Sequence, residues 1–123
     1  MNTIQAIKID VATQSVYIVE IPEVDTLNAF YEHIHCDLVS HFHLDEYHGC
    51  YVDDDGLYNE HPGYWSLSGF RKPIAGNGMI VGADTMGNTA SVRCNFINWV
   101  KENITFYKEG ESNSEPEITF ISL

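Results

Sequence analysis

The sequence predicts an α+β fold, in which a mostly antiparallel sheet of five to six strands is covered by two helices. Short stretches of alternating or β-branched apolar residues recur along the chain and predict the strands. Turn signals rich in glycine, asparagine and aspartate separate these stretches. Two segments instead repeat their apolar residues at helical spacing. With 123 residues, of which 44% are hydrophobic, the chain is long enough for one domain with a sizeable core.

The N-terminal segment predicts a hairpin followed by a helix. Residues 3–10 (TIQAIKID) and 15–21 (SVYIVEI) have the composition of two short strands, and VATQ between them can form the turn. Pro22 ends the second strand. A helix is expected over about 25–35, with an apolar stripe that should lie on the sheet. That stripe consists of Leu27, Phe30, Tyr31 and Ile34.

The middle of the chain predicts two strands that carry many of the histidines. From Cys36 the period changes from helical to alternating, which places His41 and His43 on one face of a strand. HGCYVDD, residues 48–54, predicts the next strand, and Asp-Gly at 55–56 is a strong turn signal.

The C-terminal half predicts three strands and a second helix. These are strands YWSLSGF (64–70) and MIVGAD (79–84), helix NFINWVKENI (95–104) with Asn95 as a possible cap, and closing strand ITFYK (104–108). We expect a single α+β domain over 1–108. Residues 109–123 should form a polar linker and a short apolar C-terminal strand or tail, ITFISL, through which a homo-oligomer could form.

Charge is distributed unevenly along the sequence. The chain carries a formal net charge of −12, and no Lys or Arg lies between Lys8 and Arg71. Twelve of the 18 acidic residues lie in that interval, while outside it six acids match six bases. Such a field repels the phosphates of nucleic acids and an anionic membrane surface, so direct binding to either is not expected. It attracts a basic protein and raises its encounter rate, although acidity can also serve solubility alone.

The leading functional prediction is therefore a non-enzymatic protein that binds a basic, nucleic-acid-handling or host-defence protein. The residues expected to contact this partner are Asp37, Asp45, Glu46, Asp53, Asp54, Asp55 and Glu60.

A cytoplasmic location with reduced thiols is expected. The N-terminus lacks a basic start followed by an apolar core, and no apolar run is long enough for a membrane span. Cys36, Cys50 and Cys94 are odd in number and lack the C-x-x-C spacing of zinc or redox motifs. No cofactor is expected.

The histidines near the middle of the chain raise the possibility of a metal site. If Asp45 and Glu46 form a two-residue turn, His43 lies opposite His48 and His41 lies opposite Cys50, with all four on one face. These are good zinc ligands. However, Asp-Glu is a poor hairpin turn, and a slip of one residue would move one pair to the opposite face. A polar strand face without metal is therefore favoured, and structural zinc binding is kept as an alternative.

An enzymatic function has little support. The sequence shows no nucleophile-elbow motif. Its glycine-rich stretch at 76–82 precedes a predicted strand and not a helix, unlike a phosphate-binding loop. No catalytic residue is predicted. A different alternative is a protein that sequesters a small molecule or nucleotide. The residues available to hold a ring and a phosphate would be Tyr64, Trp65, Arg71 and Lys72.

The chain also resembles a family of short phage, plasmid and bacterial proteins that is described as a domain of unknown function. The resemblance covers roughly residues 3–107. It is carried by CDLV at 36–39, DDDGL at 53–57, and the series Gly76, Gly78, Gly82, Asp84 and Gly87. It implies a small α+β fold and a link to mobile genetic elements, and it brings no catalytic residues.

Overall fold

The computed structural model describes residues 2–34, 36, 39–53, 63–69 and 73–108. Within these residues it contains two helices and two antiparallel sheets, which confirms the predicted α+β fold. In chain order the elements are β1 (Thr3–Asp10), β2 (Ser15–Pro22), α1 (Thr26–Ile34), β3 (Val39–His43), β4 (His48–Asp53), β5 (Gly63–Leu67), β6 (Ile74–Ala75), β7 (Gly78–Ala83), β8 (Thr89–Ala90), α2 (Phe96–Asn103) and β9 (Ile104–Lys108).

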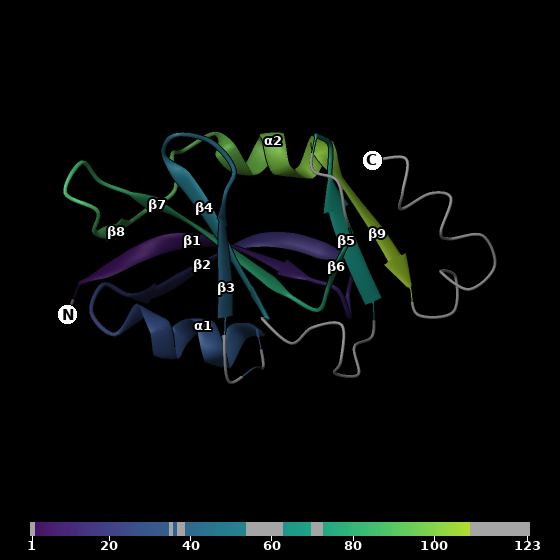
Figure 1. Cartoon of the computed structure of the whole chain (residues 1–123), viewed down its shortest axis with the longest axis horizontal. Coiled ribbons are helices and arrows are strands. Elements are labelled where there is room, and N and C mark those ends of the chain that lie inside the picture. Colours follow the sequence, from purple (N-terminus) through teal and green to yellow (C-terminus); the bar gives the residue numbers. More distant parts are fainter. Residues whose placement is uncertain (1, 35, 37–38, 54–62, 70–72, 109–123) are drawn as a thin grey trace.

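The six-stranded main sheet lies between the two helices (Figure 1). Its strand order is β2-β1-β7-β4-β3, and β8 pairs with the end of β7. The second sheet has the order β6-β5-β9 and lies on the same side of the main sheet as α2. No helix among the described residues is long and apolar enough to cross a membrane.

Side-chain alternation along β1 and β7 supplies both faces of the main sheet with apolar residues, because successive side chains of a strand point to opposite faces. One face packs against α1. The core on that side contains Ile4, Ala6, Ile21, Ala29, Phe30, Ile34, Met79 and Val81. The other face packs against α2 and the second sheet. Its core contains Ile7, Ile9, Val11, Val16, Cys50, Val52, Trp65, Leu67, Ile80, Val92 and Val100.

Trp65 joins the second sheet to the main sheet. Its side chain is 1% exposed, and its indole N–H donates to the carbonyl oxygen of Gly76 at 3.0 Å. The ring lies directly on Gly78 of β7, where a Cβ would come within 2.7 Å of the ring atom Cζ2. The absence of a side chain at residue 78 therefore allows the two sheets to approach closely.

Asn77 provides a buried polar link between the hairpin and the first helix. Its side-chain oxygen accepts from the backbone N–H of Val11 at 3.0 Å, and its amide donates to the carbonyl oxygen of His33 at 3.1 Å. Both functions of this amide are thus hydrogen-bonded, as the burial of a polar group requires.

The sequence predicted both helices and the long strands, with small shifts at their ends. It missed the two-residue strands β6 and β8, which are too short to show a period. In α1 the expected stripe is only partly buried, because Leu27 is 46% exposed while Ala29 takes a core position. The predicted tail, 109–123, lies outside the described residues, as does the turn at 55–56.

The contact between Trp65 and Gly78 predicts a specific energetic coupling. Gly78→Ala should lower the free energy of unfolding by about 1–3 kcal/mol, because the enclosed indole cannot move away from the added methyl group. In a Trp65→Phe background, where Cζ2 is missing, the same change should cost much less. A double-mutant cycle from urea unfolding measures this coupling. Equal costs in the two backgrounds would show that the ring does not lie on Gly78.

Candidate functional site

The turn between β3 and β4 positions the hydrogen-bonded side chains of Asp45 and His48. Phe42 lies opposite Cys50, and His43 lies opposite Gly49. The chain reverses through residues 45–47, and the backbone N–H of Leu44 donates to the carbonyl oxygen of His48 at 2.9 Å. The two-residue turn at Asp45 and Glu46, on which the conditional zinc site depended, is therefore not formed, since the loop is one residue longer.

The carboxylate of Asp45 organises this loop. One of its oxygens accepts from the backbone N–H groups of Tyr47 at 2.8 Å and His48 at 2.5 Å. An aspartate side chain that accepts from residues two and three positions ahead supplies the turn geometry that glycine or asparagine supplies elsewhere. Burial alone would raise the pKa of Asp45, but the hydrogen bonds from His48 and Tyr47 outweigh it and hold the pKa below its usual value.

The imidazole of His48 is enclosed, with 1% of the residue exposed, and both ring nitrogens are hydrogen-bonded. Nδ1 lies 3.1 and 3.2 Å from the two oxygens of Asp45. Nε2 accepts from the backbone N–H of Arg93 at 3.1 Å. Because a backbone N–H can only donate, Nε2 carries no proton, and the ring is neutral with its proton on Nδ1. The ring also stacks on Phe96, with 3.6 Å between centroids.

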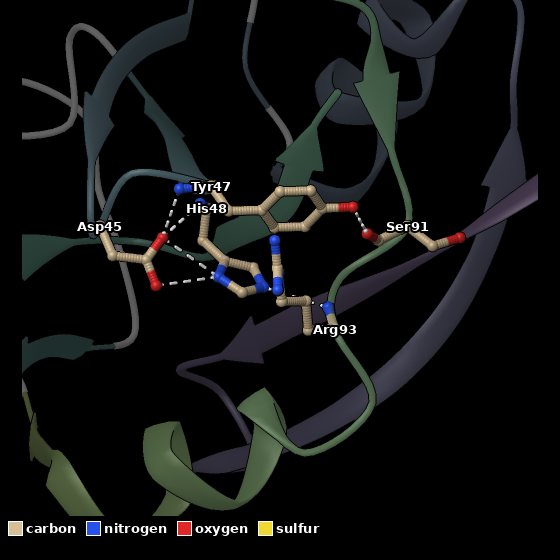
Figure 2. Close-up of polar contacts among 5 residues, drawn as sticks. All are labelled: Asp45, Tyr47, His48, Ser91 and Arg93. Carbon is tan, nitrogen blue, oxygen red and sulfur yellow. Dashed lines mark hydrogen bonds and ion pairs between the residues drawn. The ribbon is translucent and has the colours of Figure 1, made fainter. Parts of the chain in front are cut away.

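A second set of contacts holds the side chain of Arg93. The Tyr47 hydroxyl donates to the carbonyl oxygen of Ser91 at 2.7 Å, and the Tyr47 ring lies on Gly82. The guanidinium carbon of Arg93 lies 4.3 Å from the centre of that ring, a cation–π contact. Figure 2 shows the two sets together, with Asp45 and His48 fixing the backbone of Arg93 and Tyr47 lying beside its side chain.

Asp45, His48 and Arg93 border an open hollow of about 530 Å³ between the β3–β4 turn and the start of α2. We call it the Arg93 hollow; it is lined by Leu44, Asp45, His48, Arg93, Cys94, Asn95, Phe96 and Trp99. An Asp–His pair beside a cysteine has the composition of a nucleophilic site. However, Nε2 of His48, the atom that would take a proton from a nucleophile, is already occupied by a backbone N–H. The geometry therefore suits binding better than proton transfer.

The four conditional metal ligands do not converge. His41 and His43 lie on the face of the sheet that carries α1, whereas His48 and Cys50 lie on the α2 face. A shared face would require His41 to lie opposite Cys50, but the register is shifted by one residue and Phe42 lies there instead. Burial also raises the pKa of the Cys50 thiol, which disfavours the thiolate that binds zinc. In the described part of the chain, no three His, Cys, Asp or Glu side chains are grouped so as to hold a metal ion.

His41 and His43 instead belong to an aromatic row on the sheet. The His41 ring lies on Gly49, with its centroid 4.7 Å from that of Tyr51 and 4.9 Å from that of His43. Burial lowers the pKa of His41, and the neighbouring His43 lowers it further. The two imidazoles are thus exposed rings on an edge strand of the sheet.

The residues predicted to contact a basic partner have different environments. Glu46 is exposed at the tip of the β3–β4 turn, and the carboxylate of Asp45 is occupied by the turn itself. Asp53 is only 7% exposed at the end of β4, so its carboxylate is not available as a surface charge. The remaining predicted positions, Asp37, Asp54, Asp55 and Glu60, lie outside the described residues.

The residues predicted for a small-molecule site are also unsuited, as far as they are described. The ring of Trp65 is enclosed in the core and offers no free face to a ligand. Tyr64 is half-buried in β5 next to it. Arg71 and Lys72 lie outside the described residues.

The structure reveals an acidic hollow that the sequence did not predict. Glu23 and Asp25, which precede α1, border the same open hollow of about 830 Å³ as Asp84, which follows β7. The backbone N–H groups of Asn88 and Met86 donate to Asp84 and hold its pKa below the usual value. Runs of acidic residues were visible in the sequence, but the meeting of 23–25 with residue 84 depends on the pairing of β1 with β7.

A protein-family model described as a domain of unknown function, DUF3846, matches residues 4–105. Neither the curated proteins nor the solved structures contain a significant match to the chain.

The lowered pKa of Asp45 predicts a pH-dependent contribution to stability. A carboxyl group whose pKa is lower in the folded than in the unfolded chain stabilises the fold above its unfolded pKa of about 4, and this contribution is lost as the pH falls through the folded pKa. Asp45→Asn should therefore lower the melting temperature at pH 7. The difference in melting temperature between this variant and the unmutated protein should become smaller as the pH approaches 3.

The matched control for this series is Glu46→Gln, which neutralises the adjacent exposed carboxylate. Thermal unfolding between pH 7 and pH 3 should give nearly the same melting temperature for this variant and the unmutated protein. If the melting temperature of Asp45→Asn differs from that of the unmutated protein by the same amount over this whole range, the hydrogen bonds assigned to the Asp45 carboxylate are contradicted.

Proposed function

The chain belongs to the DUF3846 family, and we propose that it is a non-enzymatic accessory protein of phage or plasmid type that binds a basic protein. The partner would be a nucleic-acid-handling or host-defence protein, because proteins that neutralise phosphates present the Lys and Arg side chains that an acidic surface attracts. The mobile-element origin rests on the family resemblance. The binding mode rests on the distribution of charge in sequence and structure.

The observation that carries the proposal is the acidic hollow bordered by Glu23, Asp25 and Asp84. These three carboxylates come from separate parts of the chain and border one open volume. In the described ranges, none of them has a Lys or Arg side chain within ion-pair distance. Three carboxylates in one concavity, with no cationic partner in the described ranges, raise the local concentration of cations and suit the entry of a Lys or Arg side chain.

Exposed apolar side chains beside the acidic hollow fit a protein partner better than a free cation. Val24, between the two acidic residues, is 70% exposed, and Met86 in the β7–β8 turn is 82% exposed. Apolar contacts surrounded by charged groups are typical of protein interfaces, in which methionine is enriched. Acidity for solubility alone requires neither the concavity nor these exposed side chains.

The absence of catalysis is part of the proposal and is supported by His48. Its Nδ1 pairs with Asp45, and its second nitrogen accepts from the backbone N–H of Arg93. A general base must reach the proton that it removes, and this nitrogen cannot do so without breaking that hydrogen bond.

Charge neutralisation in the acidic hollow should weaken binding to a basic probe. The variant is Glu23→Gln with Asp25→Asn; asparagine is chosen because Asp25 has a left-handed backbone, φ 66°, which asparagine tolerates. Affinity for a peptide of ten lysines, measured by isothermal titration at 50 and 150 mM salt, should fall about threefold to tenfold, as expected for the loss of two exposed ion pairs.

The matched control is Glu32→Gln with Glu102→Gln, which removes the same charge from exposed positions on α1 and α2. This pair should change the affinity less than twofold. If both pairs weaken binding equally, the peptide responds to net charge alone and the acidic hollow is not the binding surface.

A further inference from the structure

Among the residues that the structure describes, Arg93 has no carboxylate partner, although the protein is strongly acidic. The chain has 18 acidic and six basic residues, so a surface guanidinium would be expected to have an acidic neighbour. Among the described residues, however, no Asp or Glu lies within ion-pair distance of Arg93. Its side chain contacts the Tyr47 ring instead.

The guanidinium is held in place before any ligand arrives. The backbone of Arg93 is fixed by its N–H donation to His48, whose ring is fixed in turn by Asp45. The guanidinium lies over the ring of Tyr47, whose hydroxyl is bonded to the backbone of Ser91. Binding to a cation held at both ends costs less conformational entropy than binding to a freely rotating side chain.

The rest of the Arg93 hollow supplies an apolar wall and a neutral polar group. Leu44, Phe96 and Trp99 line it, and Phe96 and Trp99 stack with 5.3 Å between their centroids. Trp99 is 36% exposed although it is a large aromatic residue. Asn95 precedes α2 at the N-cap position, and its side chain makes no capping hydrogen bond, which leaves its amide available to the hollow.

We propose that the Arg93 hollow binds a small organic anion that combines a flat ring with a carboxylate or phosphate group. The anionic group pairs with the guanidinium of Arg93 and accepts from the amide of Asn95. The ring lies against Phe96 and Trp99. A guanidinium matches the two oxygens of either anion, and the volume of about 530 Å³ lies in the range of ligand sites.

The net charge of the protein does not prevent such binding. At physiological salt, charges are screened over about 8 Å, so distant carboxylates act weakly on an anion held against a guanidinium. The nearest carboxylate in the hollow, Asp45, is already hydrogen-bonded to His48 and to the backbone of the turn. This site is separate from the acidic hollow and does not depend on the function proposed above.

Four probes separate the contributions to binding, each at 150 mM salt. Adenosine monophosphate carries a ring and a phosphate, and indole-3-acetate carries a ring and a carboxylate. Adenosine carries a ring without an anionic group, and inorganic phosphate is an anion without a ring. At least one of the first two should bind with a Kd below about 1 mM and change the fluorescence of Trp99, and the other two should bind at least tenfold more weakly. Which of the first two binds identifies the anionic group.

Two variants test the assignment on the whole chain. Arg93→Gln keeps the backbone N–H that reaches His48 and should weaken the binding probe at least tenfold. Lys101→Gln removes an exposed cation of α2 outside the hollow and should change the Kd less than twofold. Trp99→Leu should also weaken binding, by removing the ring contact. The proposal is overturned if neither ring-bearing anion binds, or if Arg93→Gln binds as tightly as Lys101→Gln.

Discussion

The two hydrogen bonds of the His48 ring are the contact on which the rest of the site depends. One of them joins the ring to Asp45, within a β3–β4 loop that is one residue longer than a two-residue hairpin loop. The other ties the ring to the backbone of Arg93, which follows β8 far along the chain. A buried imidazole is tolerated here because both nitrogens are satisfied and the ring stacks on Phe96. The turn that follows an edge strand and the segment that carries Arg93 are therefore both hydrogen-bonded to one side chain.

The general architecture was predictable because both helices and the longer strands show their own local period. The β3–β4 register was not, since two registers one residue apart fit the alternation equally well. One places His41 and His43 on the same face as His48 and Cys50, and the other places them on the opposite face. The choice between them depends on Asp45, whose carboxylate replaces glycine as the turn former. The enclosure of Trp65 and the meeting of Glu23 with Asp84 depend on pairings between distant strands, and such pairings leave no local signal.

The chain presents two surfaces of opposite character. The acidic hollow beside α1 has three carboxylates and exposed apolar side chains, which suit a basic protein. The Arg93 hollow at the start of α2 has a fixed cation beside aromatic rings, which suits a small anion. Residues 91–92 lie beside β1 through hydrogen bonds to Gln5, and they connect the turn that carries Asp84 with the segment that carries Arg93.

The protonation pattern of His48 tests this account most directly. Because Nε2 accepts from a backbone N–H and Nδ1 faces a carboxylate, the ring must be neutral with its proton on Nδ1. Nitrogen-15 NMR of the imidazole at neutral pH reports which nitrogen is protonated. The account predicts a protonated Nδ1 and an unprotonated Nε2. It also predicts that the chemical shift of Nε2 changes when the hydrogen bond from the Arg93 backbone N–H is broken. A proton on Nε2 would contradict it, because that nitrogen could not then accept from Arg93, and the arrangement of the hollow would have to differ.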